Sequence, residues 1–190
     1  MTTGTAVRTI KTTPMTTETA TVTRREPATR RSRIVVAGLG NFLLRDDGVG
    51  VHAIQALQEL LPRGVCTIEL GGAVLDALHL FERTDRILAI DAMRAGGQPG
   101  TIYRFVVKDL NDRTVKASLH EIELLEALTL LKNDRRPAIA VLGVEPEMID
   151  SGTELSPSVQ TALPQVVAAA EYIVGRWNTP PLPMAPALAE

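Results

Sequence analysis

The stretch of residues 34–51, IVVAGLGNFLLRDDGVGV, constrains the fold of this chain more than any other. It starts with a short apolar run, breaks at Gly38 and Gly40, and then carries two adjacent carboxylates, Asp46 and Asp47. Apolar residues at helical spacing begin directly after this acidic pair. Strand–glycine–helix units often receive a phosphate at the helix N-terminus, but here the sequence places negative charge at that point. The order predicts a strand, a tight turn and a helix built around two carboxylates.

Strands and helices alternate along the rest of the chain. The predicted strands are residues 34–38, 65–70, 86–91, 101–107 and 138–144, with 101–107 at an edge of the sheet. The predicted helices are residues 48–61, 73–81, 118–131 and 157–177. Most of these strands are continuous apolar runs, which is typical of strands covered on both faces. The alternation predicts an α/β fold: a three-layer α/β/α sandwich around a mainly parallel central sheet.

The start and course of two helices carry local signals. Ser118 and Glu121 have the spacing of a capping box at the start of the third helix. Ser156 precedes Pro157, an arrangement that favours the start of the last helix. Pro164 lies inside that helix and predicts a kink there.

The 190 residues predict one domain with two tails. Hydrophobic residues make up 45% of the chain and aromatic residues only 3%, so the core is aliphatic. Residues 1–32 are rich in Thr and Arg without any helical or strand period, which predicts a disordered extension. Residues 33–177 form the predicted domain, and residues 178–190 hold four prolines and are predicted to be a loose tail.

Charge and cysteine content exclude several classes of protein. The formal net charge of −2 and the sequence pI of about 6.0 give no basis for a nucleic-acid partner. No apolar run approaches the ~18 residues of a membrane span, so no membrane partner is expected. Cys66 is the only cysteine, which rules out an internal disulfide framework and a cysteine-based metal cluster. A reducing, cytoplasmic setting fits this composition best.

Two carboxylates fall where α/β folds place their sites, outside the carboxyl ends of the strands. Asp91 closes an apolar strand, where it is either solvated, partnered by a cation or functional. Asp47 opens the first helix, where an acidic residue also suits the helix dipole, and Asp46 could cap the helix equally well. Position alone does not separate these alternatives.

His120 differs from the other two histidines, His52 and His79, which are predicted to be ordinary partly buried or surface residues. It lies two residues after Ser118, the predicted helix cap, where the helix dipole favours a neutral imidazole. A neutral imidazole is the form that binds a metal. Together with Asp47 and Asp91, His120 would make a mixed oxygen and nitrogen site for a divalent transition metal. The three residues form no local motif, so their spacing is weak evidence by itself.

Other interpretations of the glycine turn fit less well. A dinucleotide-binding fingerprint needs a third glycine where Leu43 stands, although Glu69 sits where a ribose-binding acid could. No G-K-[ST] follows the turn, which excludes a P-loop, and the chain has no G-x-S-x-G elbow of a serine hydrolase.

The motifs nevertheless resemble, in their order, those of the [NiFe]-hydrogenase maturation endopeptidases, which trim a C-terminal extension from the hydrogenase large subunit. The similarity extends from about Arg33 to Trp177. It is carried by GLGNFLLRDDGVG at 38–50, the glycine pair at 71–72, ILAIDA at 87–92, SLHE at 118–121, and GVEP at 143–146 with LSP at 155–157. Five matches in the right order are more specific than any one of them.

The resemblance implies a metal site at Asp47, Asp91 and His120, the three residues already singled out. It implies a metal-dependent endopeptidase whose nickel is carried by the substrate, the large-subunit precursor, so that only nickel-loaded precursors are cut. Either nickel polarises the attacking water, or Asp47 or Asp91 acts as its general base, as in an aspartic-type endopeptidase. Leu70 and Ala73 flank the glycine pair where relatives often carry Asp and Thr, which leaves any substrate contact of that turn in doubt.

Two other functions stay open at this point. A nickel-checking chaperone of the large subunit would have the same residues but would not cut. A nucleotide-binding α/β domain is disfavoured by the missing third glycine.

Overall fold

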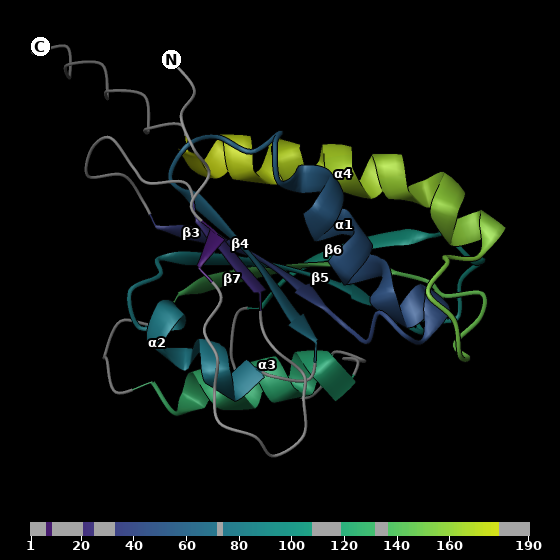
Figure 1. The fold of residues 1–190 in the computed structure, drawn as a ribbon, viewed down its shortest axis with the longest axis horizontal. Coiled ribbons are helices and arrows are strands. Elements are labelled where there is room, and N and C mark those ends of the chain that lie inside the picture. Colours follow the sequence, from purple (N-terminus) through teal and green to yellow (C-terminus); the bar gives the residue numbers. More distant parts are fainter. Residues whose placement is uncertain are drawn as a thin grey trace, which may run out of the picture.

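A sheet lies between two layers of helices in the computed structural model of the protein, which describes residues 7–8, 21–24, 33–71, 74–107, 119–131 and 137–178 (Figure 1). The strands are β1 (Val7–Arg8), β2 (Thr21–Arg24), β3 (Ile34–Leu39), β4 (Val65–Gly71), β5 (Arg86–Ala92), β6 (Ile102–Val107) and β7 (Ala138–Val144). The α-helices are α1 (Val49–Leu57), α2 (Leu78–Phe81), α3 (Leu119–Thr129) and α4 (Pro157–Asn178), and two 3-10 turns are η1 (Arg45–Gly48) and η2 (Val74–Ala77).

The described strands form one sheet in the order β1-β2-β4-β3-β5-β7-β6. The four central strands β4, β3, β5 and β7 run parallel, whereas β6 pairs antiparallel with β7 and forms an edge. Helices α1 and α4 lie on one face of the sheet, and α2 and α3 on the other (Figure 1). The predicted three-layer α/β/α sandwich and the edge position of residues 101–107 are confirmed.

The apolar run that opens the domain explains why β3 is central. Ile34 and Val36 pack with α1 and α4 on one face, while Val35, Ala37 and Leu39 pack with α2 and α3 on the other. All six residues of β3 are buried. Alternate side chains of a strand point to opposite faces, so a strand covered by helices on both sides needs apolar residues at every position.

Two short strands are described within residues 1–32, and the predicted disorder of this extension stays a prediction. Strands β1 and β2 lie within them, and β2 pairs antiparallel with β4 over Thr21–Arg24, which stand opposite Glu69 to Cys66. Backbone pairing at a sheet edge requires no apolar period, so the composition of this segment gave no signal for it. The limits of the domain at residues 33–177 and the tail at 178–190 stay predictions, and residues 179–190 lie outside the described ranges.

Three other details refine the predicted helices. The first helix begins as the turn η1 and ends at Leu57, four residues earlier than predicted. Helix α4 continues through Pro164, which lies on its exposed face. The capping box predicted at Ser118 and Glu121 lies outside the residues whose side chains are described. No helix in the described ranges has both the length and the apolar character needed to cross a membrane.

Candidate active site

Three predicted site residues from distant segments meet at the carboxyl end of the parallel strands. Asp47 lies in η1, Asp91 near the end of β5, and His120 in the first turn of α3. Asp47 Oδ2 is 3.3 Å from His120 Nε2, and this pair joins residues 73 positions apart. The fold therefore brings Asp47 and His120 into contact.

Asp91, near the end of β5, is fully buried. It has the same strand parity as Ile87 and Ala89, whose side chains pack on the α3 face, so its carboxyl group points to the face from which His120 comes. Asp91 Oδ1 accepts a hydrogen bond from the N–H of Ala92 at 2.9 Å. Its negative charge also raises the pKa of His120, which places it within electrostatic reach of the imidazole.

The glycine turn after β3 holds Asp47 in place. Gly40 has a φ of +93°, and a Cβ at this position would lie 1.8 Å from the carbonyl oxygen of Asp47 and 3.3 Å from Asp91 Oδ1. The N–H of Asn41 donates to Asp47 Oδ2 at 2.7 Å. Only glycine permits this approach, so the turn interpreted from the sequence is confirmed as the support of the Asp47 carboxylate.

The pKa values of Asp47 and His120 do not agree with the expected neutral imidazole. Burial by itself raises the pKa of Asp47. Hydrogen bonds from His120 and from the N–H of Asn41 lower it by more than burial raises it, so the pKa of Asp47 lies below its usual value. The hydrogen bond to Asp47, aided by the charges of Asp91 and Glu123, raises the pKa of His120 to about 9 despite burial. The prediction of a neutral His120 was therefore wrong for this state, because neighbouring carboxylates outweigh the helix dipole.

Asp46 has a different role from its neighbour. It is fully buried, and its carboxylate accepts four hydrogen bonds. The donors are the N–H of Glu147 at 2.9 Å, the N–H of Met148 at 2.8 Å, and the N–H and hydroxyl of Ser156 at 2.7 and 2.8 Å. Asp46 thus ties η1 to the segment between β7 and α4. It does not cap α1, which has no side-chain cap.

Glu145 is a supporting residue whose role sequence reasoning did not identify. It follows β7, is 6% exposed, and binds the loop that comes after Asp91. Its carboxylate accepts hydrogen bonds from the N–H groups of Ala95, Gly96 and Gly97 at 2.9, 3.3 and 3.1 Å, and from the hydroxyl of Tyr103 at 2.9 Å. The available signal was a glutamate at the carboxyl end of a buried strand.

The Glu145→Gln variant is expected to be less stable at pH 7 by about 2 kcal/mol, because a neutral amide accepts these hydrogen bonds less well. Burial raises the pKa of Glu145, but the hydrogen bonds lower it to below its ordinary value of 4.5. The ionised form therefore stabilises the fold fully above pH 4.5, and this contribution is lost as the pH falls below that value. Urea unfolding of both proteins between pH 7 and pH 3 measures it. The gap between them should narrow below pH 4.5, and a constant gap would contradict the lowered pKa.

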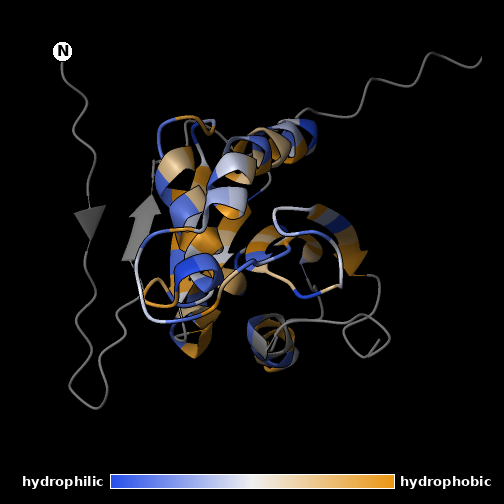
Figure 2. Cartoon of the chain, turned by 90° about the vertical axis from the view of Figure 1, so that its right-hand side faces the viewer, coloured by the Kyte–Doolittle hydropathy of each residue, from blue (hydrophilic) through white to orange (hydrophobic). Residues whose placement is uncertain are grey.

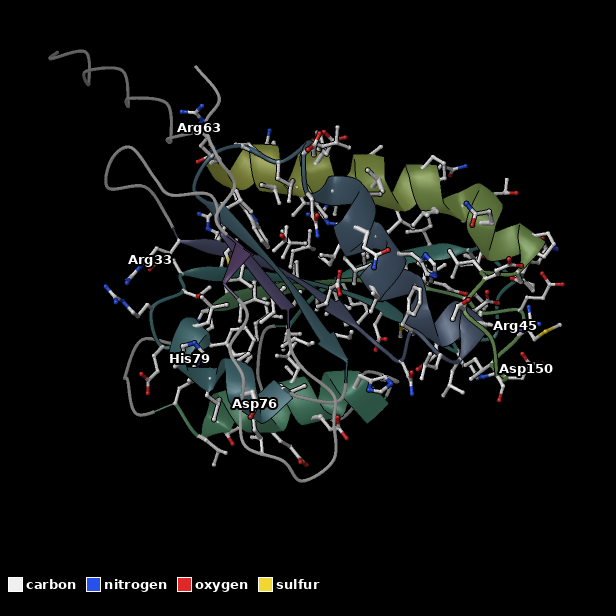
Figure 3. All side chains as sticks on the ribbon, in the orientation of Figure 1. Arg33, Arg45, Arg63, Asp76, His79 and Asp150 are labelled. Atoms are coloured by element: carbon white, nitrogen blue, oxygen red, sulfur yellow. The ribbon has the colours of Figure 1, made fainter. Side chains whose placement is uncertain are left out.

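The remaining predicted residues lie apart from this cluster. His79 hydrogen-bonds the carbonyl of Asp76 at 2.9 Å, and both lie toward the opposite end of the molecule from Arg45 (Figure 3). His52 contacts the ring of Phe42 and the carbonyl oxygen of Thr153. These two histidines are ordinary surface or partly buried residues, as predicted. No three His, Cys, Asp or Glu side chains of the described ranges are positioned to hold a metal ion by themselves.

Comparison with known proteins identifies relatives for this fold and site. The family model described as hydrogenase maturation protease matches residues 51–173. The Hydrogenase 2 maturation protease of Escherichia coli K12 is 31% identical over 149 residues, covering 72% of this chain and 90% of the relative. The hydrogenase expression/formation protein HoxM of Cupriavidus necator is 30% identical over 165 residues, covering 82% of this chain and 81% of the relative.

Solved structures agree with the sequence matches. The hydrogenase maturating endopeptidase HybD from E. coli superposes with a TM-score of 0.68 at 27% identity, covering 76% of this chain and 93% of that one. The [NiFe] hydrogenase maturation protease HybD from Thermococcus kodakarensis superposes with a TM-score of 0.66 at 28% identity, covering 75% of this chain and 99% of that one. The chain therefore belongs to the hydrogenase maturation protease family, and it is an endopeptidase that processes the C-terminus of a hydrogenase large subunit.

Proposed function

We propose that this endopeptidase cuts only a nickel-loaded large-subunit precursor of a [NiFe] hydrogenase, and that Asp47, Asp91 and His120 recognise the nickel. The nickel belongs to the substrate and has been inserted before the protease binds. The observation that carries the proposal is the contact between Asp47 Oδ2 and His120 Nε2 at 3.3 Å, with Asp91 within electrostatic reach of the imidazole.

The chemistry of these side chains suits a divalent first-row metal. One imidazole and two carboxylates make a mixed nitrogen and oxygen donor set. Two atoms bound to one ion at about 2.1 Å each lie roughly 3 Å apart, so Asp47 and His120 need little rearrangement to share a metal. Imidazole binds metal only in its neutral form, and the raised pKa of His120 favours the protonated form, so nickel has to compete with a proton at this site.

Peptide-bond hydrolysis at this site uses water. The carboxylate of Asp47 or Asp91 is placed to act as general base, and the lowered pKa of Asp47 keeps it ionised at neutral pH. Nickel in the precursor can polarise the same water as a Lewis acid. Cys66 is buried in β4, where it pairs with Val35 of β3 near the opposite end of both strands, so no thiol nucleophile is assigned. We also place the reaction in the cytoplasm, in keeping with this single, buried thiol.

The test compares nickel-loaded and nickel-free forms of one purified precursor, each incubated with the protein and analysed by mass spectrometry. Loss of a C-terminal peptide is expected only from the nickel-loaded form. Equal cleavage of both forms would contradict the proposal that the protease cuts only the nickel-loaded precursor. A stable complex without any loss of mass would instead favour the nickel-checking chaperone.

A further inference from the structure

Three large apolar side chains are exposed on segments that adjoin η1, the turn that carries Asp47. Leu43, between β3 and η1, is 63% exposed, and Met148 and Ile149, between β7 and α4, are 42% and 38% exposed. We call these three residues the apolar ridge. Single exposed apolar residues are common on protein surfaces and need no explanation, but a group on adjoining segments marks a candidate interface.

The two segments that carry the apolar ridge are joined by backbone hydrogen bonds. The N–H of Arg45 donates to the carbonyl of Gly152 at 2.8 Å, and the N–H of Gly152 donates to the carbonyl of Leu43 at 2.9 Å. The N–H of Asp46 donates to the carbonyl of Met148 at 3.2 Å. An ion pair of 2.6 Å between Arg45 and Asp150 spans the same two segments, and both residues lie together at one end of the molecule (Figure 3).

The buried Asp46 carboxylate fixes this arrangement from beneath. It holds the N–H groups of Glu147 and Met148, and its neighbour Asp47 carries the candidate catalytic group. Leu43 and Met148 are therefore presented on a backbone that is tied to the active site, rather than on a loose loop. Figure 2 turns the end of the molecule that carries Arg45 and Asp150 toward the viewer.

The other exposed large apolar residues do not share these segments. They lie singly on other parts of the described chain: Leu60, Leu75, Val106, Leu130 and Tyr172. The apolar ridge thus stands out by its location. Leu43 is only four positions from Asp47 in sequence, and the Met148 segment is bonded to Asp46, so both segments adjoin the turn that a substrate peptide has to reach.

We propose that the apolar ridge docks the folded body of the large-subunit precursor beside the segment that is cut. The proposal rests on the proposed function for the identity of the partner. Apolar side chains on a preordered backbone suit a protein surface, because little conformational entropy is lost on binding. Methionine adapts to irregular partner surfaces, and the Arg45–Asp150 pair supplies a polar rim.

The test measures cleavage of the nickel-loaded precursor by Leu43→Ser and Met148→Ser. Each variant is expected to raise KM about 10-fold and to leave kcat within about twofold, because docking is lost while the catalytic group stays in place. Leu60→Ser is the matched control: Leu60 is 52% exposed and follows α1 at the end away from Asp47, so its KM should not change. Thermal melts verify that all three variants fold.

Other outcomes overturn the proposal. An unchanged KM in both ridge variants, or a fall in kcat alone, would mean that the ridge does not dock the precursor. If the wild type is a dimer, Leu43→Ser is a monomer and KM is unchanged, the apolar ridge binds a second copy of the chain instead. If the wild type binds but does not cut, the proposed proteolysis fails, and the same variants must then weaken the measured Kd for docking to stand. If the wild type neither binds nor cuts, both proposals fail.

Discussion

Asp47→Asn is expected to abolish cleavage of the nickel-loaded precursor, by about 10³-fold or more, while the protein stays folded. The amide cannot accept a proton and binds metal weakly, so both proposed roles of Asp47 are lost. The side chain is only partly buried and accepts two hydrogen bonds, so the loss of stability should be about 1 kcal/mol. Cleavage is followed by the mass of the precursor and stability by urea unfolding. The same loss of cleavage is expected for Asp91→Ala and His120→Ala.

Asp46→Asn is the matched control, because it makes the same chemical change one residue away. Both carboxylate oxygens of Asp46 act only as acceptors. In Asp46→Asn, the amide nitrogen that replaces one of them would face a donor. The expected loss of stability is about 3 kcal/mol, with cleavage reduced in proportion to the disordering of η1. Full cleavage by Asp47→Asn would remove that residue from the site, and an unchanged stability of Asp46→Asn would contradict its anchoring role.

The chemistry at the carboxyl edge was accessible from the sequence because each contributing segment carries a strong local signal. Apolar runs fix β3 and β5 as buried strands, and the ends of parallel strands in one sheet lie at one edge. That placed Asp91 and the turn before Asp47 together. His120 was singled out by its place at the start of a helix, but that evidence was weak, and the family resemblance strengthened it.

The features that could not be predicted from the sequence depend on contacts between residues far apart in the chain. Asp46 binds backbone groups more than 100 positions away, and a carboxylate that caps another segment resembles an ordinary helix cap in sequence. The charge of His120 was misjudged for the same reason, since its pKa is raised mainly by Asp47 and Asp91, which lie on distant segments of the chain. Strand β2 was missed because it is recognised by its backbone pairing with β4, for which its sequence gives no apolar period.

Gly40→Ala is expected to reduce cleavage about 100-fold and stability by about 3 kcal/mol. The added methyl group would lie 1.8 Å from the Asp47 carbonyl oxygen and 3.3 Å from Asp91 Oδ1, so the turn must move and carry Asp47 with it. A displacement of about 1 Å at a catalytic group is enough for a 10²-fold loss. The φ of +93° adds backbone strain for any residue with a Cβ. Cleavage of the nickel-loaded precursor and urea unfolding measure the two effects.

Gly96→Ala separates the effect of the close contact from the effect of backbone strain. Gly96 has nearly the same backbone angle, a φ of +87°, but a Cβ there meets nothing within 4 Å. Only the conformational cost of about 1 kcal/mol is expected, with cleavage close to that of the wild type. If both variants lose the same stability and both keep their activity, the close approach of Gly40 to Asp47 does not matter for catalysis. If only Gly40→Ala loses cleavage, the contact between the glycine turn and the two carboxylates sets the geometry of the active site.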